Sequence, residues 1–312
     1  MEKFFVSVVI AAKNASGTLR KCLDSIMALH DSACEVIVVN DGSADTTAVI
    51  AAVYPGITLI NTSHAGCSGA RNLGVRHARG EFVAFVDADS FVGPGWLDAL
   101  RTGFVSPQVA GVGGIQKSPE DERPFGKKVQ TFFLAFGFIS NYMQFSSTLK
   151  EVKHNANCNV LYRKAAFDEI GGFWASPLAG EDVDLDHRLR KKGYRLMMNP
   201  DAVIFHYRTQ TFKGFADMMF RYGMGQGRLV RLHGMFRWIH GLPFFTLGAG
   251  ALLVVGLLTQ TGLTISLYGI VLLGLLCRVA FDPTLTGLSV IAFAAWNAGF
   301  LKSFFVHKCE SQ

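Results

Sequence analysis

A short apolar run that ends in two carboxylates places the strongest constraint on the fold of this chain. Residues 82–86 read FVAFV, and Asp87 and Asp89 follow directly. Such a run is typical of a strand buried on both faces of a parallel sheet. Ligands of open α/β sheets bind outside the carboxyl ends of the strands, and hard divalent cations prefer carboxylate and phosphate oxygens. The run therefore predicts a site for a cation and a diphosphate, although a solvated turn also explains Asp-x-Asp alone.

The rest of the first 210 residues alternates between strand and helix patterns. Runs of β-branched and apolar residues predict strands at 6–10, 35–40, 57–61, 111–116 and 202–205. Apolar residues at helical spacing predict helices after Ser16 or Thr18, at 46–53 and at 96–104. Strand, helix and strand in succession imply right-handed crossovers and parallel pairing. We therefore expect an α/β domain over residues 1–210.

The charge and the cysteines narrow the class of protein. The net charge is +6 and the pI is near 9.0, which favours an anionic partner. No helix-turn-helix or zinc-finger pattern is present, so we do not expect nucleic acid to be that partner. The six cysteines lack metal-ligand spacing, which indicates reduced thiols in a domain that faces the cytosol. Met1–Phe5 lead directly into a strand pattern, so a cleaved signal peptide is not expected.

The chain becomes almost entirely apolar after residue 238. Three segments have about the length that crosses a bilayer, at 239–258, 263–281 and 285–305. They predict about three transmembrane helices, and Arg228, Arg231 and Arg237 before them keep the α/β domain cytoplasmic. An odd number of spans places Lys308 outside, so a re-entrant or interfacial segment is an alternative. Residues 211–238 are expected to form an amphipathic or interfacial segment that connects the two parts. The aromatic run 130–142 is expected to form a helix at the membrane interface or part of an acceptor site, and ordinary core packing is an alternative.

Two further segments carry residues suited to phosphate and proton chemistry. Gly66, Gly69 and Gly74 surround Arg71, an arrangement that presents backbone N–H groups and a guanidinium to an anion. An alternative is that Arg71 closes a surface ion pair. The second segment begins a predicted helix, and helix capping explains one acidic residue there but not four. These four are Glu181, Asp182, Asp184 and Asp186.

The successive motifs VSVVIAAKN, VVNDGSADTT and GARNLGVRHARGEFVAFVDADS resemble the family 2 glycosyltransferases, which have a GT-A (Rossmann-like) fold. The resemblance covers roughly the first 210 residues. It implies that Ala12 and Asp41 hold the nucleobase, and the adjoining loop residues Lys13 and Asn14 are grouped with this substrate site. It also implies that Arg71 lies against the nucleotide.

The resemblance also assigns the metal ligands and the base. Asp89 is implied to be the principal ligand of Mg²⁺ or Mn²⁺, with Asp87 nearer the ribose and the metal. Asp182, beside Glu181, is implied to be the catalytic base. We add the hypothesis that His206, Arg221 and Arg228 face the donor or acceptor phosphates, although a solvated basic surface explains Arg228 nearly as well.

The function implied by this resemblance is that of a membrane-bound inverting glycosyltransferase. The donor is a nucleotide sugar, with UDP favoured, and the acceptor is a lipid-linked or membrane-borne glycan. Residues 220–223 read FRYG where processive members carry Q-x-x-R-W, so the chain looks more like enzymes of exopolysaccharide and lipid-linked glycan assembly. The expected location is the inner membrane, as a multi-pass protein. The alternatives are a metal-dependent nucleotidyltransferase and a non-catalytic nucleotide-binding membrane scaffold.

Overall fold

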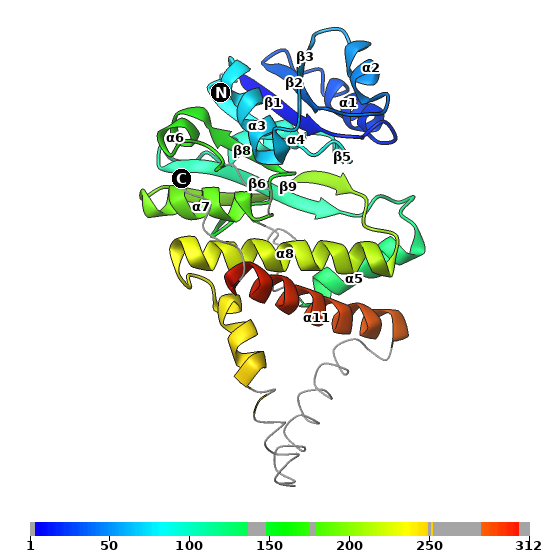
Figure 1. Ribbon diagram of the computed structural model, residues 1–312. Helices are drawn as coiled ribbons and strands as arrows, with labels where there is room; N and C mark the ends of the chain where they lie inside the picture. The colour runs from blue at the N-terminus through cyan, green and yellow to red at the C-terminus, as the bar shows by residue number, and fades with distance from the viewer. Residues whose placement is uncertain (1–3, 137–147, 175–178, 249–250, 252–281, 306–312) are drawn as a thin grey trace. The chain divides into compact units, whose positions relative to one another are not determined.

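The structure is a computed structural model that describes residues 4–136, 148–174, 179–248, 251 and 282–305 (Figure 1). The chain divides into two compact units. The first unit comprises Met1–Glu122, Ile139–Pro177 and Glu181–Tyr207. The second unit comprises Arg123–Phe138, Leu178–Gly180 and Arg208–Gln312.

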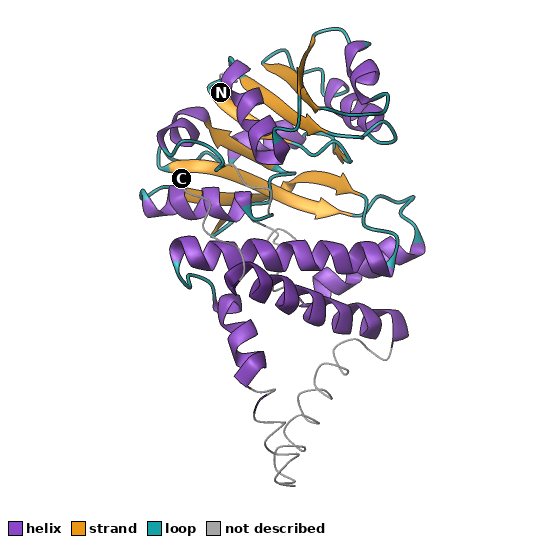
Figure 2. Ribbon diagram, viewed as in Figure 1, coloured by secondary structure: helices purple, strands orange, loops and turns teal. Residues whose placement is uncertain are grey.

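The first unit is an α/β domain built around one sheet (Figure 2). Its strands are β1 Val6–Ala12, β2 Cys34–Asp41, β3 Ile57–Thr62, β4 Phe82–Phe85, β5 Ser90–Val92, β6 Val109–Lys117, β7 Lys150–Val152, β8 Val160–Arg163 and β9 Arg195–His206. Its helices are α1 Leu19–Met27, α2 Thr47–Ala52, α3 Gly66–His77, α4 Trp96–Thr102, α6 Lys164–Glu169 and α7 Glu181–Lys191. The strand order is β3-β2-β1-β4-β8-β6-β9-β5, and β7 also pairs with β9.

The parallel pairing predicted for the first strands is confirmed. β1 pairs in parallel with both β2 and β4, and β2 pairs in parallel with β3. Helix α3 approaches this part of the sheet closely because Gly74 has no side chain. A Cβ atom there would lie 2.4 Å from Cγ1 of Val9, which is closer than two carbon atoms pack.

The remaining half of the sheet is mixed. β8 is antiparallel to β4 and β6, and β5 and β7 are antiparallel to β9. Only residues 86–89 separate β5 from β4. A parallel neighbour needs a crossover of about a dozen residues or more, so this link is too short for β5 to pair in parallel with β4. β5 is the last strand in the order and pairs with β9.

Alternate residues of the strands fill two cores, one on each face of the sheet. On β1, Val8 and Ile10 belong to one core, which they share with residues of α1 and α4, whereas Val9 belongs to the other. The second core includes residues of α3, α6 and α7. This alternation follows the period of two of a strand. It leaves the loops at the carboxyl ends of β1, β2 and β4 to carry polar groups.

The second unit is helical in its described residues. It contains α5 Pro124–Phe136, α8 Phe212–His233, the short 3₁₀-helix η2 Trp238–Gly241 and α11 Pro283–Phe305. The predicted helix at 130–142 thus begins earlier, at Pro124, and residues 137–142 lie outside the described residues. The side chain of Thr211 caps α8 by accepting a hydrogen bond from the backbone N–H of Gly214 at 3.0 Å.

Small residues let α8 and α11 pack with their backbones in close contact (Figure 1). A Cβ atom at Gly223 of α8 would lie 2.0 Å from the carbonyl oxygen of Trp296, and one at Gly299 of α11 would lie 2.1 Å from that of Phe220. Such packing of glycine against backbone is frequent between membrane helices.

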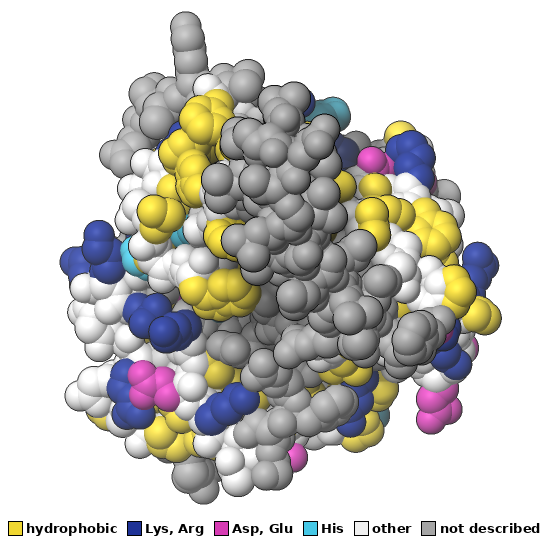
Figure 3. Space-filling view, turned by 90° about the horizontal axis from the view of Figure 1, so that it is seen from below, with side chains coloured by type: hydrophobic (Ala, Val, Ile, Leu, Met, Phe, Trp, Pro, Cys, Tyr) yellow, Lys and Arg dark blue, Asp and Glu magenta, His cyan; other side chains and the backbone are white. Residues whose placement is uncertain are grey.

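Among the described residues, α11 is the one helix long and apolar enough to cross a membrane. In its most apolar stretch of 18 residues, 39% is buried inside the structure. It coincides with the predicted span at 285–305. The predicted span at 263–281 lies outside the described residues, as do residues 249–250 and 252–258 of the span at 239–258, so about three membrane helices stays a prediction. Apolar side chains are exposed in this unit at Met235, Trp238, Phe245 and Phe305. On the face shown in Figure 3, hydrophobic side chains lie beside Lys and Arg side chains.

Candidate active site

Two carboxylates and an imidazole meet at one edge of the sheet. Asp87 and Asp89 follow β4, and the pairing of β5 with β9 sets Ser90 opposite His206. Nε2 of His206 consequently lies 3.3 Å from Oδ1 of Asp89. One ligand atom from each of Asp87, Asp89 and His206 lies within 4.8 Å of the other two. The sequence placed His206 near the phosphates and did not single it out as a candidate third metal ligand, although its position directly after a predicted strand was a usable signal.

This group fits a divalent cation. Carboxylate oxygens suit Mg²⁺ and Mn²⁺, and an imidazole nitrogen is a ligand more typical of transition metals. The side chains of Asp87 and Asp89 are 33% and 53% exposed, so they keep open faces on which a substrate oxygen can complete the coordination. Mg²⁺ or Mn²⁺ is thus the kind of ion that these residues suit.

The loops after β1 and β2 are joined through Asn14, which the sequence grouped with the substrate site. The backbone N–H of Asn14 donates to Oγ of Ser43 at 2.9 Å, and the N–H of Ala44 donates to Oδ1 of Asn14 at 2.9 Å. Asn14 has a φ of 50°, in the left-handed region that asparagine tolerates. Ala12 is buried at the end of β1, and Lys13 is exposed.

Asp41, at the end of β2, holds the start of helix α3. Its two carboxylate oxygens accept hydrogen bonds from the backbone N–H groups of Ala65 at 2.6 Å and Gly66 at 3.1 Å. An acidic group at a helix N-terminus satisfies free donors and complements the helix dipole. Contact of Asp41 with a nucleobase stays a prediction, and its observed role is to fix the helix that carries Arg71.

Arg71 joins the two acidic motifs. Its Nη2 donates to Oδ1 of Asp87 and its Nη1 donates to Oε1 of Glu181, each at 2.7 Å. The Arg71 residue is only 4% exposed, so this is a buried double ion pair rather than the surface pair considered from the sequence. The guanidinium that was predicted to lie against the nucleotide is held by two carboxylates. Phosphate binding by Arg71 stays a prediction.

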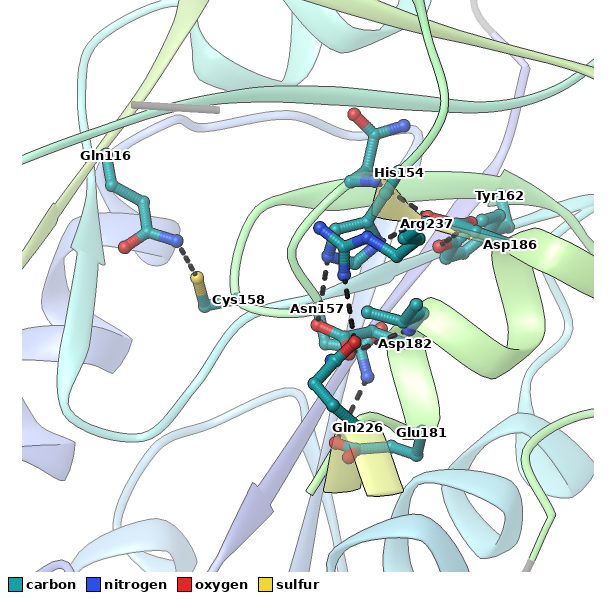
Figure 4. A network of polar contacts seen from close by, with 12 residues as sticks. Gln116, His154, Asn157, Cys158, Tyr162, Glu181, Asp182, Asp186, Gln226 and Arg237 are labelled. Atoms are coloured by element: carbon teal, nitrogen blue, oxygen red, sulfur yellow. Dashed lines mark hydrogen bonds and ion pairs between the residues drawn. The ribbon is translucent and has the colours of Figure 1, made fainter. Parts of the chain in front are cut away.

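The four acids at the start of α7 divide into different roles. Glu181 bonds to Arg71 and also accepts from Nδ2 of Asn157 at 3.4 Å. Asp184 is fully buried and forms an ion pair with Arg188 at 2.7 Å, one helical turn later. Asp186 is also fully buried, and Tyr162 donates to it at 2.7 Å (Figure 4).

Asp182 is the acid of this cluster that combines partial exposure with a perturbed titration. Its side chain is 23% exposed, and Oδ2 lies 3.6 Å from Nε2 of His154. The pKa of Asp182 is raised, and its largest cause is burial of the carboxyl group. The charge of His154 lowers this pKa, and the adjacent Glu181 raises it, so the net shift is upward. A carboxyl group with a raised pKa is a stronger base when it is ionised.

The structure thus brings most of the predicted site residues together within the first unit. Arg71 links the group of Asp87, Asp89 and His206 to the Glu181 and Asp182 pair, although more than ninety residues separate the two acidic motifs. Arg221 and Arg228 are exceptions, since both belong to α8 in the second unit. Their contact with a phosphate stays a prediction.

The fold and this site define the class as a GT-A-like α/β protein. The profile of "Glycosyl transferase family 2" matches residues 7–171, more than half of the chain. The chain therefore belongs to glycosyl transferase family 2.

Relatives and a solved structure agree with this assignment. The pre-mycofactocin glycosyltransferase of Mycobacterium tuberculosis is 33% identical over 233 residues, 72% of this chain and 48% of the relative. The poly-beta-1,6-N-acetyl-D-glucosamine synthase of Staphylococcus aureus is 26% identical over 239 residues, 74% of this chain and 56% of the relative. The chain thus spans about half the length of these curated relatives. The structure of the mannosyltransferase PcManGT from Pyrobaculum calidifontis, in complex with GDP-Man and Mn²⁺, has a TM-score of 0.72 and 19% identity, and the match covers 99% of this chain and 89% of that one.

Proposed function

We propose that this chain is an inverting glycosyltransferase that moves a sugar from a nucleotide-sugar donor to an acceptor hydroxyl. The observation that carries the proposal is the double ion pair of Arg71 with Asp87 and Glu181. Sugar transfer requires a site for the leaving diphosphate and a proton acceptor at the same anomeric carbon. Arg71 ties the residues suited to the first task to the carboxylates suited to the second.

Each residue then has a defined task. A Mg²⁺ or Mn²⁺ ion held by Asp89, Asp87 and His206 would stabilise the charge that develops on the leaving nucleoside diphosphate. Asp182 takes the proton from the acceptor hydroxyl as the new bond to the sugar forms. The acceptor oxygen attacks the anomeric carbon on the face opposite the leaving group, so one displacement inverts the configuration. Glu181 belongs to the catalytic pair by holding Arg71 at the start of the helix that carries Asp182.

The donor is proposed to bind across the carboxyl ends of β1 and β2. Ala12, Lys13, Asn14 and Asp41 surround this place, where the family resemblance puts the nucleobase. That resemblance favours UDP, whereas the mannosyltransferase of similar fold binds GDP-Man. A comparison of UDP- and GDP-sugars by thermal shift with Mn²⁺ identifies the base, because a ligand that binds only the folded protein raises its melting temperature.

The metal site gives the proposal its first test. With Mn²⁺ present, the protein is expected to release nucleoside diphosphate from its donor as sugar reaches the acceptor, and EDTA is expected to abolish transfer. Asp89→Asn and His206→Ala should each weaken Mn²⁺-dependent donor binding at least tenfold, because each removes one ligand of the ion. Calorimetric titration of donor with and without Mn²⁺ measures this.

Asp201→Asn is the matched control, since Asp201 is an exposed acid on β9, the strand that carries His206. It should bind the donor as the unmodified protein does. Release of pyrophosphate in place of nucleoside diphosphate would favour a nucleotidyltransferase. Binding without any turnover across acceptor extracts would favour a scaffold.

The acceptor is proposed to be a lipid-linked or membrane-borne glycan, reached from the cytoplasmic face of the inner membrane. The support is the apolar helix α11, the exposed side chains of Trp238 and Phe245, and the Arg231 and Arg237 side chains that precede the apolar tail. The multi-pass arrangement rests on the sequence pattern at 239–281.

Membrane fractionation tests this part of the proposal. The full chain is expected to stay in the membrane pellet after alkaline carbonate extraction and to dissolve in detergent, because about 20 apolar residues per span are sufficient for integral insertion. A truncation after residue 238 should leave the pellet on the same treatment if it remains folded. Release of the full chain by carbonate would contradict integral attachment.

A further inference from the structure

Asp186 is a buried carboxylate that the proposed reaction does not use. It has no exposed surface, yet three donors converge on it. Oδ1 accepts from the Tyr162 hydroxyl at 2.7 Å, and Oδ2 accepts from the backbone N–H of Asn155 at 2.7 Å and lies 3.0 Å from Nδ1 of His154 (Figure 4). A buried acid with several donors is held rigidly, because leaving any of these groups unpaired is costly.

This arrangement fixes the ring of His154. A carboxylate can only accept hydrogen bonds, so the Nδ1 atom that faces Asp186 carries the proton. The opposite ring atom, Nε2, then faces Oδ2 of Asp182 at 3.6 Å. His154 is itself largely buried, with 11% of its side chain exposed. One carboxylate therefore orients the imidazole, and the imidazole lies against the proposed catalytic base.

We propose that His154 is a positioning residue for Asp182, oriented by Asp186, that holds the base in its ionised form and fixes the direction of its carboxylate. The inference rests on the proposed function, since it gives His154 a task only if Asp182 accepts a proton. It extends the site from the Glu181 and Asp182 pair to the segment just before β8, to which no role was assigned.

The charges around Asp182 give this role a direction. Burial raises the pKa of Asp182, His154 lowers it, and Glu181 and Asp186 raise it. Cys67 and Arg71 of α3 and Tyr162 of β8 are further titratable or charged groups that interact within this cluster. Without His154, the pKa of Asp182 rises further, and the base is lost at a higher pH.

His154→Gln tests the proposal, because glutamine keeps an N–H donor but carries no charge. The pH profile of kcat/KM for transfer is expected to keep its shape while its acidic limb moves to higher pH. A limb that moves by about one pH unit lowers activity about tenfold on the acidic side and little at high pH. Donor binding with Mn²⁺ should be unchanged. A loss of activity that is equal at every pH would overturn the proposal, since a structural role alone gives that result.

Two further variants keep the test decisive. His154→Ala should show the same shift, and added imidazole should restore the acidic limb by filling the vacated position. His154→Ala takes the place of His154→Gln if the glutamine variant does not fold. If the acidic limb of the His154→Ala profile is unmoved and imidazole does not change its activity, the proposal is wrong. His77→Gln, at an exposed histidine of α3, is the matched control and should leave the profile unmoved. An active Asp182→Asn protein would refute the proposal that Asp182 is the base. If Asp182→Asn is inactive and the pH profile of His154→Gln is unmoved, the role of His154 is refuted and the proposed function stands.

Discussion

Replacement of Asp182 by asparagine is expected to lower kcat by about 10²- to 10⁴-fold, the range that a general base contributes to catalysis. The amide has nearly the same shape as the carboxylate but does not accept the proton of the acceptor hydroxyl. Donor binding should be unchanged, because the groups suited to the cation and diphosphate are Asp87, Asp89 and His206. Transfer kinetics together with calorimetric titration of the donor separate the two effects.

The same substitution at an exposed acid is the control for Asp182. Asp168→Asn removes a carboxylate of α6 that forms an exposed ion pair with Lys164, and it should leave both kcat and donor binding unaltered. Near-normal turnover by a folded Asp182→Asn protein would remove Asp182 from the role of base.

Arg71→Ala is expected to have the second large effect, on stability as well as activity. It leaves Asp87 and Glu181 without the guanidinium group that both carboxylates contact at 2.7 Å. Removal of one partner of a buried ion pair costs about 3–5 kcal/mol in the free energy of unfolding. Thermal or urea unfolding measures the loss, which Mn²⁺ and donor should partly restore if they neutralise Asp87.

Two variants sharpen the interpretation of Arg71. Arg71→Lys keeps the charge but not the planar fork that bonds two carboxylates at once, so we expect intermediate stability and a low kcat. Arg76→Ala, at an exposed arginine of the same helix, should change stability by no more than about 0.5 kcal/mol. If Arg71→Ala unfolds at the same denaturant concentration as the unmodified protein, the double ion pair does not hold the site together.

The sequence predicted the parallel half of the sheet because its signals are local. The first four strands are rich in β-branched and apolar residues, and a crossover helix follows each of the first three. Polar residues at a strand end therefore singled out Asp87 and Asp89 without knowledge of the structure, whereas Asp41 was assigned by the family resemblance. The pairing of β5 with β9 is not local, since Ser90 and His206 lie far apart along the chain. The place of His206 beside Asp87 and Asp89, as a candidate metal ligand, was not predicted for that reason.

The acidic cluster shows a second limit of the sequence. Asp184 pairs with Arg188, which lies four residues later on the same helix, the spacing at which side chains of one helix meet. The partners of Glu181, Asp182 and Asp186 come from other elements, namely α3, β8 and the segment before β8. No periodicity of α7 reveals such partners. The sequence therefore identified the cluster and left the separate tasks of its four acids undetermined.

The antiparallel register of β5 and β9 has a consequence for exchanging parts between relatives. Because neighbouring residues of a strand point to opposite faces, a shift of β9 by one position would turn Phe205 or Tyr207, in place of His206, toward Asp89. A hybrid protein joined anywhere between residues 93 and 194 inherits its two carboxylates from one parent and its imidazole from the other. Recombination is best confined to junctions that keep β4, β5 and β9 from a single parent.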